Sequence, residues 1–297
     1  MTMMCAVKER VTHAEASKRD VQEEALRMGV PQASGGWGGG AAELVSAMAA
    51  ATMASPALAV GTAAQRMLIE VVLRSGNVGL REYRLPALLE RDIPGNCAAL
   101  WSLGRMPPLQ AMDMGRAWAV HGDVAPTCNL RADWFLLSAP VRFGAASDYA
   151  LVLFRSDEDG VAHHDAALPA MADTHRAALR LDRVYFREDE LLADDGPGFV
   201  RSLMPFALSV RTALLLGACM GMVQGWQDGM AREAELHMLR SLLQGVAVLA
   251  GLADTAGLEA RLAAARRLVR GYAERPISVS TTVGVERRAL FAPLLDV

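Results

Sequence analysis

The order of hydrophobic and polar positions divides the chain into a helical part, a strand-rich part and a second helical part. The strand pattern is clearest over Ala117–Phe154, where short apolar clusters alternate with Gly, Asp, Pro and Asn; the clusters are Ala117–Val120, Trp134–Ala139 and Tyr149–Phe154. Such spacing is typical of consecutive β-strands. Ala178–Phe186 alternates apolar and polar residues, which predicts a further strand with one face exposed to water.

Ala-rich helical patterns come before the strands. We expect helices over Val7–Met28, Ala41–Ala54, Ala57–Ser75 and Leu80–Arg91. The Ala41–Ala54 helix ends before Pro56, because the residue preceding a proline is disfavoured in the helical conformation. A turn at Asp92–Asn96 then marks the first domain boundary.

The segment Phe199–Met230 is apolar on nearly every side, which predicts a helix buried inside a bundle. Its small residues recur every three or four positions and allow close helix packing; they are Gly217, Ala218, Gly221 and Gly225. Two further helices are predicted over Arg232–Asp254 and Leu258–Glu274, with a break at Ala256–Gly257, and Pro276–Val297 stays unassigned. The sequence thus predicts an α+β multidomain protein with domains over 1–92, 93–192 and 193–297.

Composition and charge narrow the range of possible functions. With 297 residues and 52% hydrophobic content, the chain can bury a large core. A formal charge of -3 leaves no surplus of positive charge for a nucleic acid backbone, so nucleic acid is not the expected partner. The four cysteines form no CxxC pair, and we expect reduced thiols in the cytoplasm. Ala41–Ala64 contains Glu43 and Pro56, so no membrane span is expected there.

Several local motifs have both a chemical and a structural interpretation. The glycine run Ser34–Gly40 is a helix connector or a phosphate loop, and its spacing favours the connector. The acidic turn Asp157–Gly160 is a solvated turn or a cation site, and no ligand spacing follows it. His163, His164 and Asp165, with His175, form a loop or a metal site. Adjacent histidines on an extended segment point to opposite faces, so the loop is favoured and no metal is predicted.

A family resemblance follows from the order of several longer motifs. These are MGVPQASGGWGGG, LPALLERDIPGNCAAL, GDVAPTCNLRADWFLLSA and LRLDRVYFREDELLADDGPGF followed by LSVRTALLLGA. Between Leu26 and Met230 the chain resembles the acyl-CoA dehydrogenase family of flavoproteins in colinear order. The resemblance implies an N-terminal helical domain, a central β-barrel-like domain and a shortened C-terminal helical bundle. It also implies FAD bound between the last two, with an acyl thioester beside it.

The resemblance assigns cofactor contacts residue by residue. The first two contacts, a hydroxyl and a glycine, stand where the family has its first flavin-binding turn. The next two, a thiol and an amide, stand where the family has its second flavin-binding strand. The last is an arginine on the helix that follows the sheet. The implied contacts are Ser102, Gly104, Cys128, Asn129 and Arg211. From the residues alone, Cys128 is a nucleophile only beside a base, and a small apolar strand residue is the favoured interpretation.

No catalytic base is identified. The family mechanism needs a carboxylate beside the substrate. One usual position is Val210 here, and the Gly-Gly loop of the other is missing after Gly40. Asp228 and Glu233 are substitutes, weighed against a role as solvated helix carboxylates.

Two hypotheses from different classes remain. The first is a flavin-dependent oxidoreductase acting on an acyl-CoA or a related small molecule. The second is a catalytically inactive member of the fold that serves as a binding or assembly subunit. Because the last helical domain is short, we expect its apolar faces to be buried against another subunit. The expected assembly is a homodimer at least, or a complex with a full-length paralogue.

Overall fold

The computed structural model describes residues 18–115, 117–144, 148–166, 169–226 and 228–274. Residues 18–27 form a helix. The further helices described are η1 (Gln32–Ser34), α2 (Ala41–Ala54), α3 (Pro56–Arg74), α4 (Val78–Leu89), α5 (Ala98–Trp101), η2 (Pro169–Thr174), η3 (Glu188–Glu190), α6 (Gly196–Gln224), α7 (Gly229–Gly251) and α8 (Thr255–Glu274). The strands are β1 (Gly95–Cys97), β2 (Leu109–Asp113), β3 (Trp118–Thr127), β4 (Leu136–Phe143), β5 (Ala150–Arg155), β6 (Val161–Asp165), β7 (Ala177–Phe186) and β8 (Leu191–Ala193).

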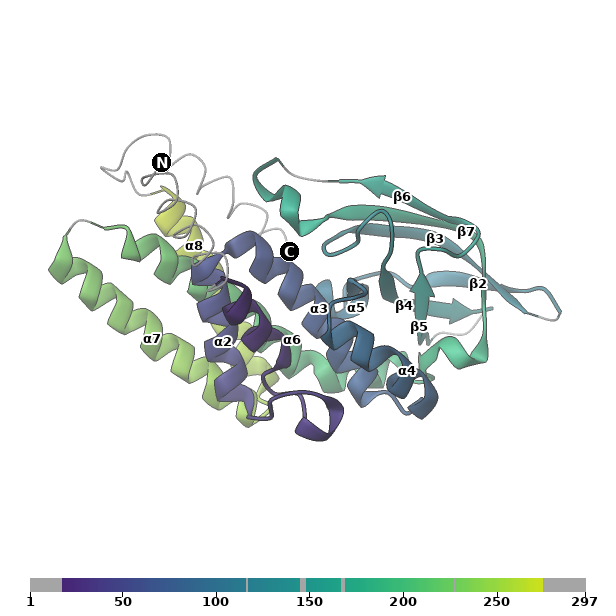
Figure 1. Ribbon diagram of the computed structural model, residues 1–297, viewed down its shortest axis with the longest axis horizontal. Helices are drawn as coiled ribbons and strands as arrows, with labels where there is room; N and C mark the ends of the chain where they lie inside the picture. The colour runs from purple at the N-terminus through teal and green to yellow at the C-terminus, as the bar shows by residue number, and fades with distance from the viewer. Residues whose placement is uncertain (1–17, 116, 145–147, 167–168, 227, 275–297) are drawn as a thin grey trace, which may run out of the picture.

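The predicted order of helices, sheet and helices is confirmed. Helices α2, α6, α7 and α8 form a bundle at one end of the molecule, and the sheet lies at the other, with α3 and α5 between them (Figure 1). All described strands fall between Gly95 and Ala193, inside or next to the predicted domain of 93–192. Residues 7–17 of the predicted Val7–Met28 helix and the unassigned segment 276–297 lie outside the described residues.

The sheet is mixed. Its eight strands follow the order β6-β7-β3-β2-β4-β5-β8, and β1 pairs with β4. The pairs β1–β4 and β2–β4 are parallel and the remaining neighbours antiparallel. Strand β4 is buried over Leu136–Val141, as expected for a central strand covered on both faces. Strand β7 shows the predicted alternation, with Ala177, Leu179 and Leu181 buried between more exposed residues.

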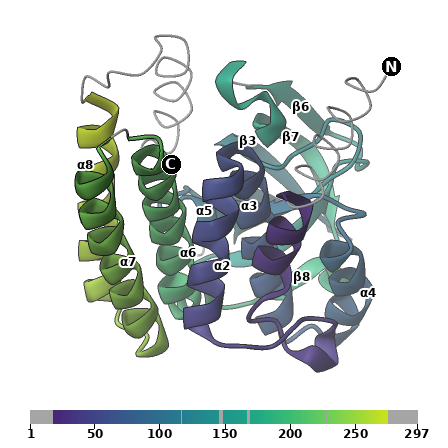
Figure 2. The ribbon, with the colours of Figure 1, turned by 60° about the vertical axis from the view of Figure 1, so that its left-hand side comes forward.

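Helix α6 is the buried centre of the bundle, as its apolar sequence predicts, but it ends at Gln224, so Met230 of the predicted Phe199–Met230 helix belongs to α7. Gly217 lies against the backbone of α2: a Cβ added there would stand 2.5 Å from the carbonyl oxygen of Ala49. The small residue therefore sets how closely α2 and α6 approach. Figure 2 shows these two helices side by side, with α7 and α8 forming the outer layer. Two described helices, α3 and α6, are long and apolar enough to span a membrane, and most of each is buried inside the protein.

The break between the last two helices lies earlier than predicted. Ala256 and Gly257 are inside α8, which begins at Thr255. The turn occurs at Leu252–Asp254, where Ala253 has a left-handed backbone (φ 53°). The Asp254 side chain then accepts the amide hydrogen of Gly257 at 3.0 Å. Asp254 therefore caps α8, which explains why Gly257 does not interrupt it.

Candidate functional site

A cavity of about 270 Å³ lies where the sheet domain meets the C-terminal helices; we call it the junction pocket. The turn after α5 contributes one wall, and α6 and α8 contribute the others. Its lining residues are Leu103, Arg105, Met204, Leu208, Glu259, Leu262, Ala263 and Arg266. The spacing of Glu259, Leu262 and Arg266 along α8 places them on one helix face, as does that of Met204 and Leu208 on α6.

Positive charge is concentrated around the junction pocket. Burial, together with the nearby charges of Arg266 and Arg105, lowers the pKa of Arg211 to about 9. The pKa of Arg266 is lowered as well, first by burial and then by Arg105 and Arg270. Glu259 is the one carboxylate among the lining residues. An anionic ligand here would therefore reduce repulsion among arginines.

Arg211 lies behind the pocket, one turn along α6 from Leu208. Its side chain is 4% exposed, and Nη1 donates a hydrogen bond to the carbonyl oxygen of Trp101 at 2.5 Å. The guanidinium carbon also lies 5.7 Å from the centre of the Trp101 ring. Arg211 thus fastens the end of α5 to α6, which fixes the turn that forms the pocket wall.

Ser102 and Gly104 belong to that same turn. The Ser102 hydroxyl donates to the carbonyl oxygen of Ala99 at 3.1 Å and accepts the amide hydrogen of Met106 at 3.0 Å. Gly104 has a left-handed backbone (φ 73°), a conformation that glycine adopts without strain. Both residues therefore shape the turn, and the Ser102 hydroxyl already has internal partners.

Cys128 follows β3 and is 4% exposed. Burial raises the pKa of its thiol to about 11, and neighbouring Thr174, Arg176 and Arg211 oppose the shift. A thiol that stays protonated at neutral pH is a poor nucleophile. Cys128 lies near Arg211, and therefore on the buried side of the junction pocket.

Asn129 faces away from the junction pocket, toward α3. Its side-chain amide donates to Gln65 Oε1 at 2.7 Å and to the carbonyl oxygen of Gly95 at 2.8 Å. The backbone of Asn129 is left-handed (φ 63°), a conformation that Asn tolerates better than most residues. The structure therefore brings Ser102, Gly104, Cys128 and Arg211 to one junction and leaves Asn129 as a link between α3 and β1.

These contacts bear on how a flavin would fit. The arginines of the junction pocket suit the phosphate groups of FAD or of a CoA thioester. Fewer free hydrogen-bonding groups are available to the polar edge of an isoalloxazine ring, because the Ser102 hydroxyl and the Asn129 amide hydrogens are already bonded within the chain. The residues present thus fit an anionic ligand better than they fit the ring itself.

The substitute bases lie elsewhere. Asp228 caps α7, where its Oδ1 accepts the amide hydrogens of Met230 and Ala231 at 3.0 and 3.1 Å. Glu233 is exposed and forms an ion pair with Arg232 at 3.6 Å. Neither residue lines the junction pocket. Sequence reasoning missed Glu259, Arg105 and Arg266, although the seven-residue spacing of Glu259 and Arg266 was a visible signal of a shared helix face.

His163, His164 and Asp165 do not lie in a loop but form part of edge strand β6, whereas His175 lies in the loop between η2 and β7. The segment is strand because it pairs with β7 over its whole length. His163 Nε2 lies 3.0 Å from the carbonyl oxygen of Leu130. Within the described part of the chain, no group of three or more His, Cys, Asp or Glu side chains is arranged to hold a metal ion.

The acidic turn is partly buried. Asp157 and Asp159 are exposed, as predicted for a solvated turn. Glu158 differs, since its side chain is 10% exposed and lies 3.4 Å from Arg155 Nε. Burial, with the nearby charge of Glu190, raises the pKa of Glu158 to about 7.

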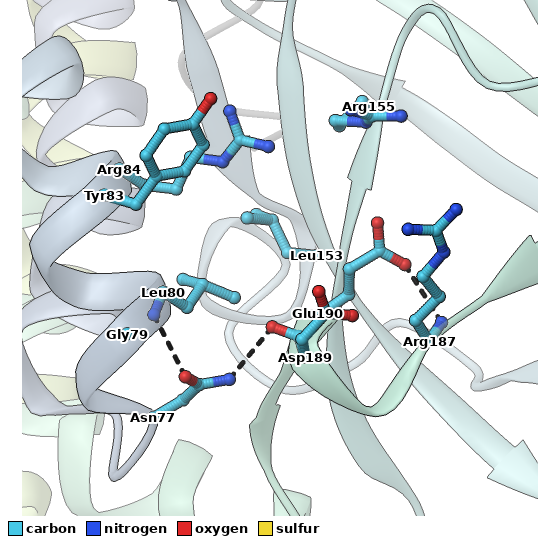
Figure 3. A pocket seen from close by; sticks show the side chains of 10 residues that line it. All are labelled: Asn77, Gly79, Leu80, Tyr83, Arg84, Leu153, Arg155, Arg187, Asp189 and Glu190. Atoms are coloured by element: carbon cyan, nitrogen blue, oxygen red, sulfur yellow. Dashed lines mark hydrogen bonds between the residues drawn. The ribbon is translucent and has the colours of Figure 1, made fainter.

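A larger cavity of about 450 Å³ lies between α4 and the sheet (Figure 3). Asn77 closes one end, where it caps α4 and donates to the carbonyl oxygens of Asp189 and Leu191. The charged side chains around it carry both signs; they are Arg84, Arg155, Arg187, Asp189 and Glu190. None of the residues that the resemblance assigns is near this cavity, whereas Ser102, Gly104 and Arg211 adjoin the lining of the junction pocket, which is therefore the stronger candidate.

Comparison with known proteins supports the fold. No family matches at the level of sequence, and no curated relative does. Glutaryl-coenzyme A dehydrogenase in its glutaryl-CoA complex is similar with TM-score 0.75 and 16% identity, covering 95% of this chain and 81% of that one. Dibenzothiophene monooxygenase from Paenibacillus sp. A11-2 gives 0.73 and 14%, covering 96% and 85%. PigA with FAD and proline gives 0.70 and 13%, covering 95% and 85%. The chain therefore has the acyl-CoA dehydrogenase fold.

Proposed function

We propose that this protein is a flavin-dependent oxidoreductase of the acyl-CoA dehydrogenase type that acts on an acyl thioester or a related small substrate at the junction pocket. The observation that carries the proposal is the arginine-lined pocket between the turn after α5, α6 and α8. Among the similar structures, one is a complex with glutaryl-CoA and another holds FAD. Phosphate-bearing ligands of that kind match the charge of the pocket.

The lining residues have distinct roles in this proposal. Arg105 and Arg266 bind and orient the phosphate groups of the ligand. Leu103, Met204 and Leu262 cover its apolar part and exclude water. FAD, when bound, supplies the acceptor for a hydride from the substrate. Glu259 is the candidate proton acceptor, because it is the carboxylate among the residues that line the pocket.

The second candidate is a binding or assembly subunit without catalysis. It is favoured by one observation: the Ser102 hydroxyl and the Asn129 amide hydrogens, both assigned to the flavin by resemblance, have partners within the chain. Such a subunit would keep the fold and the arginine pocket and would bind an anionic ligand without transferring hydride.

Anaerobic titration separates the two candidates. The purified full chain is incubated with FAD, freed of excess, and mixed with a panel of acyl-CoA thioesters under anaerobic conditions. The oxidoreductase proposal predicts retained flavin whose visible absorbance is bleached by at least one thioester, and a Glu259→Gln variant that retains flavin without bleaching. Retained flavin that no thioester bleaches, or a protein that binds acyl-CoA but no FAD, supports the second candidate.

We also propose that the chain works as a homo-oligomer in the cytoplasm, or in a complex with a full-length paralogue. Support for association comes from α7 and the residue that follows it: Met230 and Val248 of α7 are 87% and 61% exposed, and Leu252 is 72% exposed. Light scattering at micromolar concentration tests this: the proposal expects at least a dimer, and a monomer contradicts self-association.

A further inference from the structure

A third cavity, of about 380 Å³, lies on the opposite side of α6 from the junction pocket and is bordered by α2, α3, α6 and the end of α7. We call it the bundle cavity. Ser202, Phe206 and Ser209 line it from α6, whereas Met204 and Leu208 line the junction pocket. Residues two apart on a helix point in nearly opposite directions. The two cavities are therefore separate.

Arg66, on α3, is the buried charge of the bundle cavity. Its side chain is 1% exposed, and Nη1 donates to Glu70 Oε2 at 2.9 Å. Its Nε has no hydrogen-bond partner among the described residues. The ring of Phe206 lies under the guanidinium, 4.9 Å from the ring centre to the guanidinium carbon. A guanidinium with an unpartnered donor is costly to bury unless a ligand completes its bonds.

The charges around Arg66 do not cancel. Glu70 uses one carboxylate oxygen for Arg66 and the other for Arg74, whose Nε lies 3.0 Å away. Two arginines thus share one carboxylate, and the cavity wall keeps one net positive charge. Arg74 is 66% exposed in its side chain and stands at the rim, so Arg66 is the cation that faces a desolvated ligand.

The remaining wall is largely apolar. Leu44, Leu203, Pro205, Phe206 and Ala250 supply it. The hydroxyls of Ser202 and Ser209 donate to carbonyl oxygens of their own helix, so they present oxygen lone pairs to the cavity without a free donor. The first turn of α2 also reaches the wall at Gly40, where the Glu43 carboxylate already accepts the amide hydrogen. The cavity thus combines one net positive charge with an apolar body.

We propose that the bundle cavity binds a small organic monoanion, a carboxylate with a short aliphatic chain, whose oxygens accept hydrogen bonds from the Arg66 donors that Glu70 leaves free. One negative charge matches the net charge of the Arg66–Glu70–Arg74 group. The aliphatic chain matches Leu44, Leu203 and Phe206. This site is independent of the proposed oxidoreductase reaction, because it lies across α6 from the junction pocket.

Isothermal titration of the full chain with hexanoate, and with hexan-1-ol as the uncharged match, tests the proposal. Hexanoate is expected to bind at least about tenfold more tightly than hexanol, which corresponds to about 1.4 kcal/mol. No binding of hexanoate, or equal binding of both compounds, would overturn the site.

Two variants locate the binding without breaking the buried ion pair. Ala250→Leu fills the cavity from α7 and is expected to weaken hexanoate binding by about tenfold or more, whereas Val248→Leu, on the exposed face of the same helix, leaves it unchanged. Arg74→Gln removes the net positive charge from the rim and is expected to weaken binding several-fold. Binding that Ala250→Leu and Arg74→Gln leave unchanged would overturn the assignment to this cavity.

Discussion

The Arg211 guanidinium and the Trp101 carbonyl oxygen are joined by a hydrogen bond of 2.5 Å that links α6 to the end of α5. The next residue, Ser102, begins the turn that forms one wall of the junction pocket. The helix arginine that the resemblance assigns to the flavin therefore also holds the backbone beside the candidate site. Its buried charge makes the pocket more positive, which favours anionic ligands.

The contact between α2 and α6 predicts opposite effects for two glycines of α6. An added Cβ at Gly217 would stand 2.5 Å from the Ala49 carbonyl oxygen, whereas at Gly221 its nearest neighbour is 3.8 Å away. Gly217→Ala is expected to lower the free energy of unfolding by about 1 to 3 kcal/mol through overpacking. Gly221→Ala is expected to raise it by about 0.5 to 1 kcal/mol through helix propensity. Denaturant unfolding of both variants measures the difference, and equal effects would contradict this packing.

A substitution at Asn129 distinguishes a structural role of this residue from a role in binding the cofactor. Asn129→Gly keeps the left-handed backbone and removes the two bonds to Gln65 and Gly95. The expected loss in free energy of unfolding is about 1 to 3 kcal/mol, because buried acceptors lose their donors. FAD affinity should stay unchanged. A variant of normal stability that binds FAD more weakly would instead assign Asn129 to the cofactor.

Glu158 makes stability depend on pH. Its pKa in the folded protein, about 7, lies above its ordinary value. Between the ordinary value and about 7, the folded state holds more protons than the unfolded state, so the free energy of unfolding falls as pH rises through this interval. Glu158→Gln should remove that fall and be more stable than the parent by about 1 to 2 kcal/mol at about pH 8.

The matched control for this effect is Asp159→Asn, an exposed carboxyl in the same turn. It should leave the pH profile of stability unchanged. Urea unfolding across the pH range supplies the measurement. A parent protein whose stability rises between acid and neutral pH, in parallel with Glu158→Gln, would exclude the effect.

Periodicity in the sequence was sufficient to predict most helices and strands of the fold. Helix α2 begins and ends where the pattern predicts, and α6 is buried as its all-round apolar sequence indicates. The edge strand at His163–Asp165 was missed because its alternation is weak and polar. Its strand character comes from pairing with β7, a contact that no local pattern contains.

The candidate site was less accessible from the sequence. Arg105 and Arg266 are far apart in the chain, and only the packing of α8 beside the turn after α5 brings them to one pocket. Ser102, Gly104 and Arg211 were found through family order and do meet near that pocket, while Asn129 points toward α3. Which polar groups already have partners inside the protein depends on tertiary contacts, and these are not visible in spacing or composition.

Direct titration of the purified full chain with FAD, followed by quenching of flavin fluorescence, tests whether the junction pocket binds a flavin. Saturable binding is expected, and it should weaken by about tenfold in an Arg105→Met, Arg266→Met double variant, since the phosphate groups lose their cations. Ala250→Leu in the bundle cavity should bind FAD like the parent. Absence of FAD binding by the folded parent protein, or binding that the double variant leaves unchanged, would contradict a flavin site at the junction pocket.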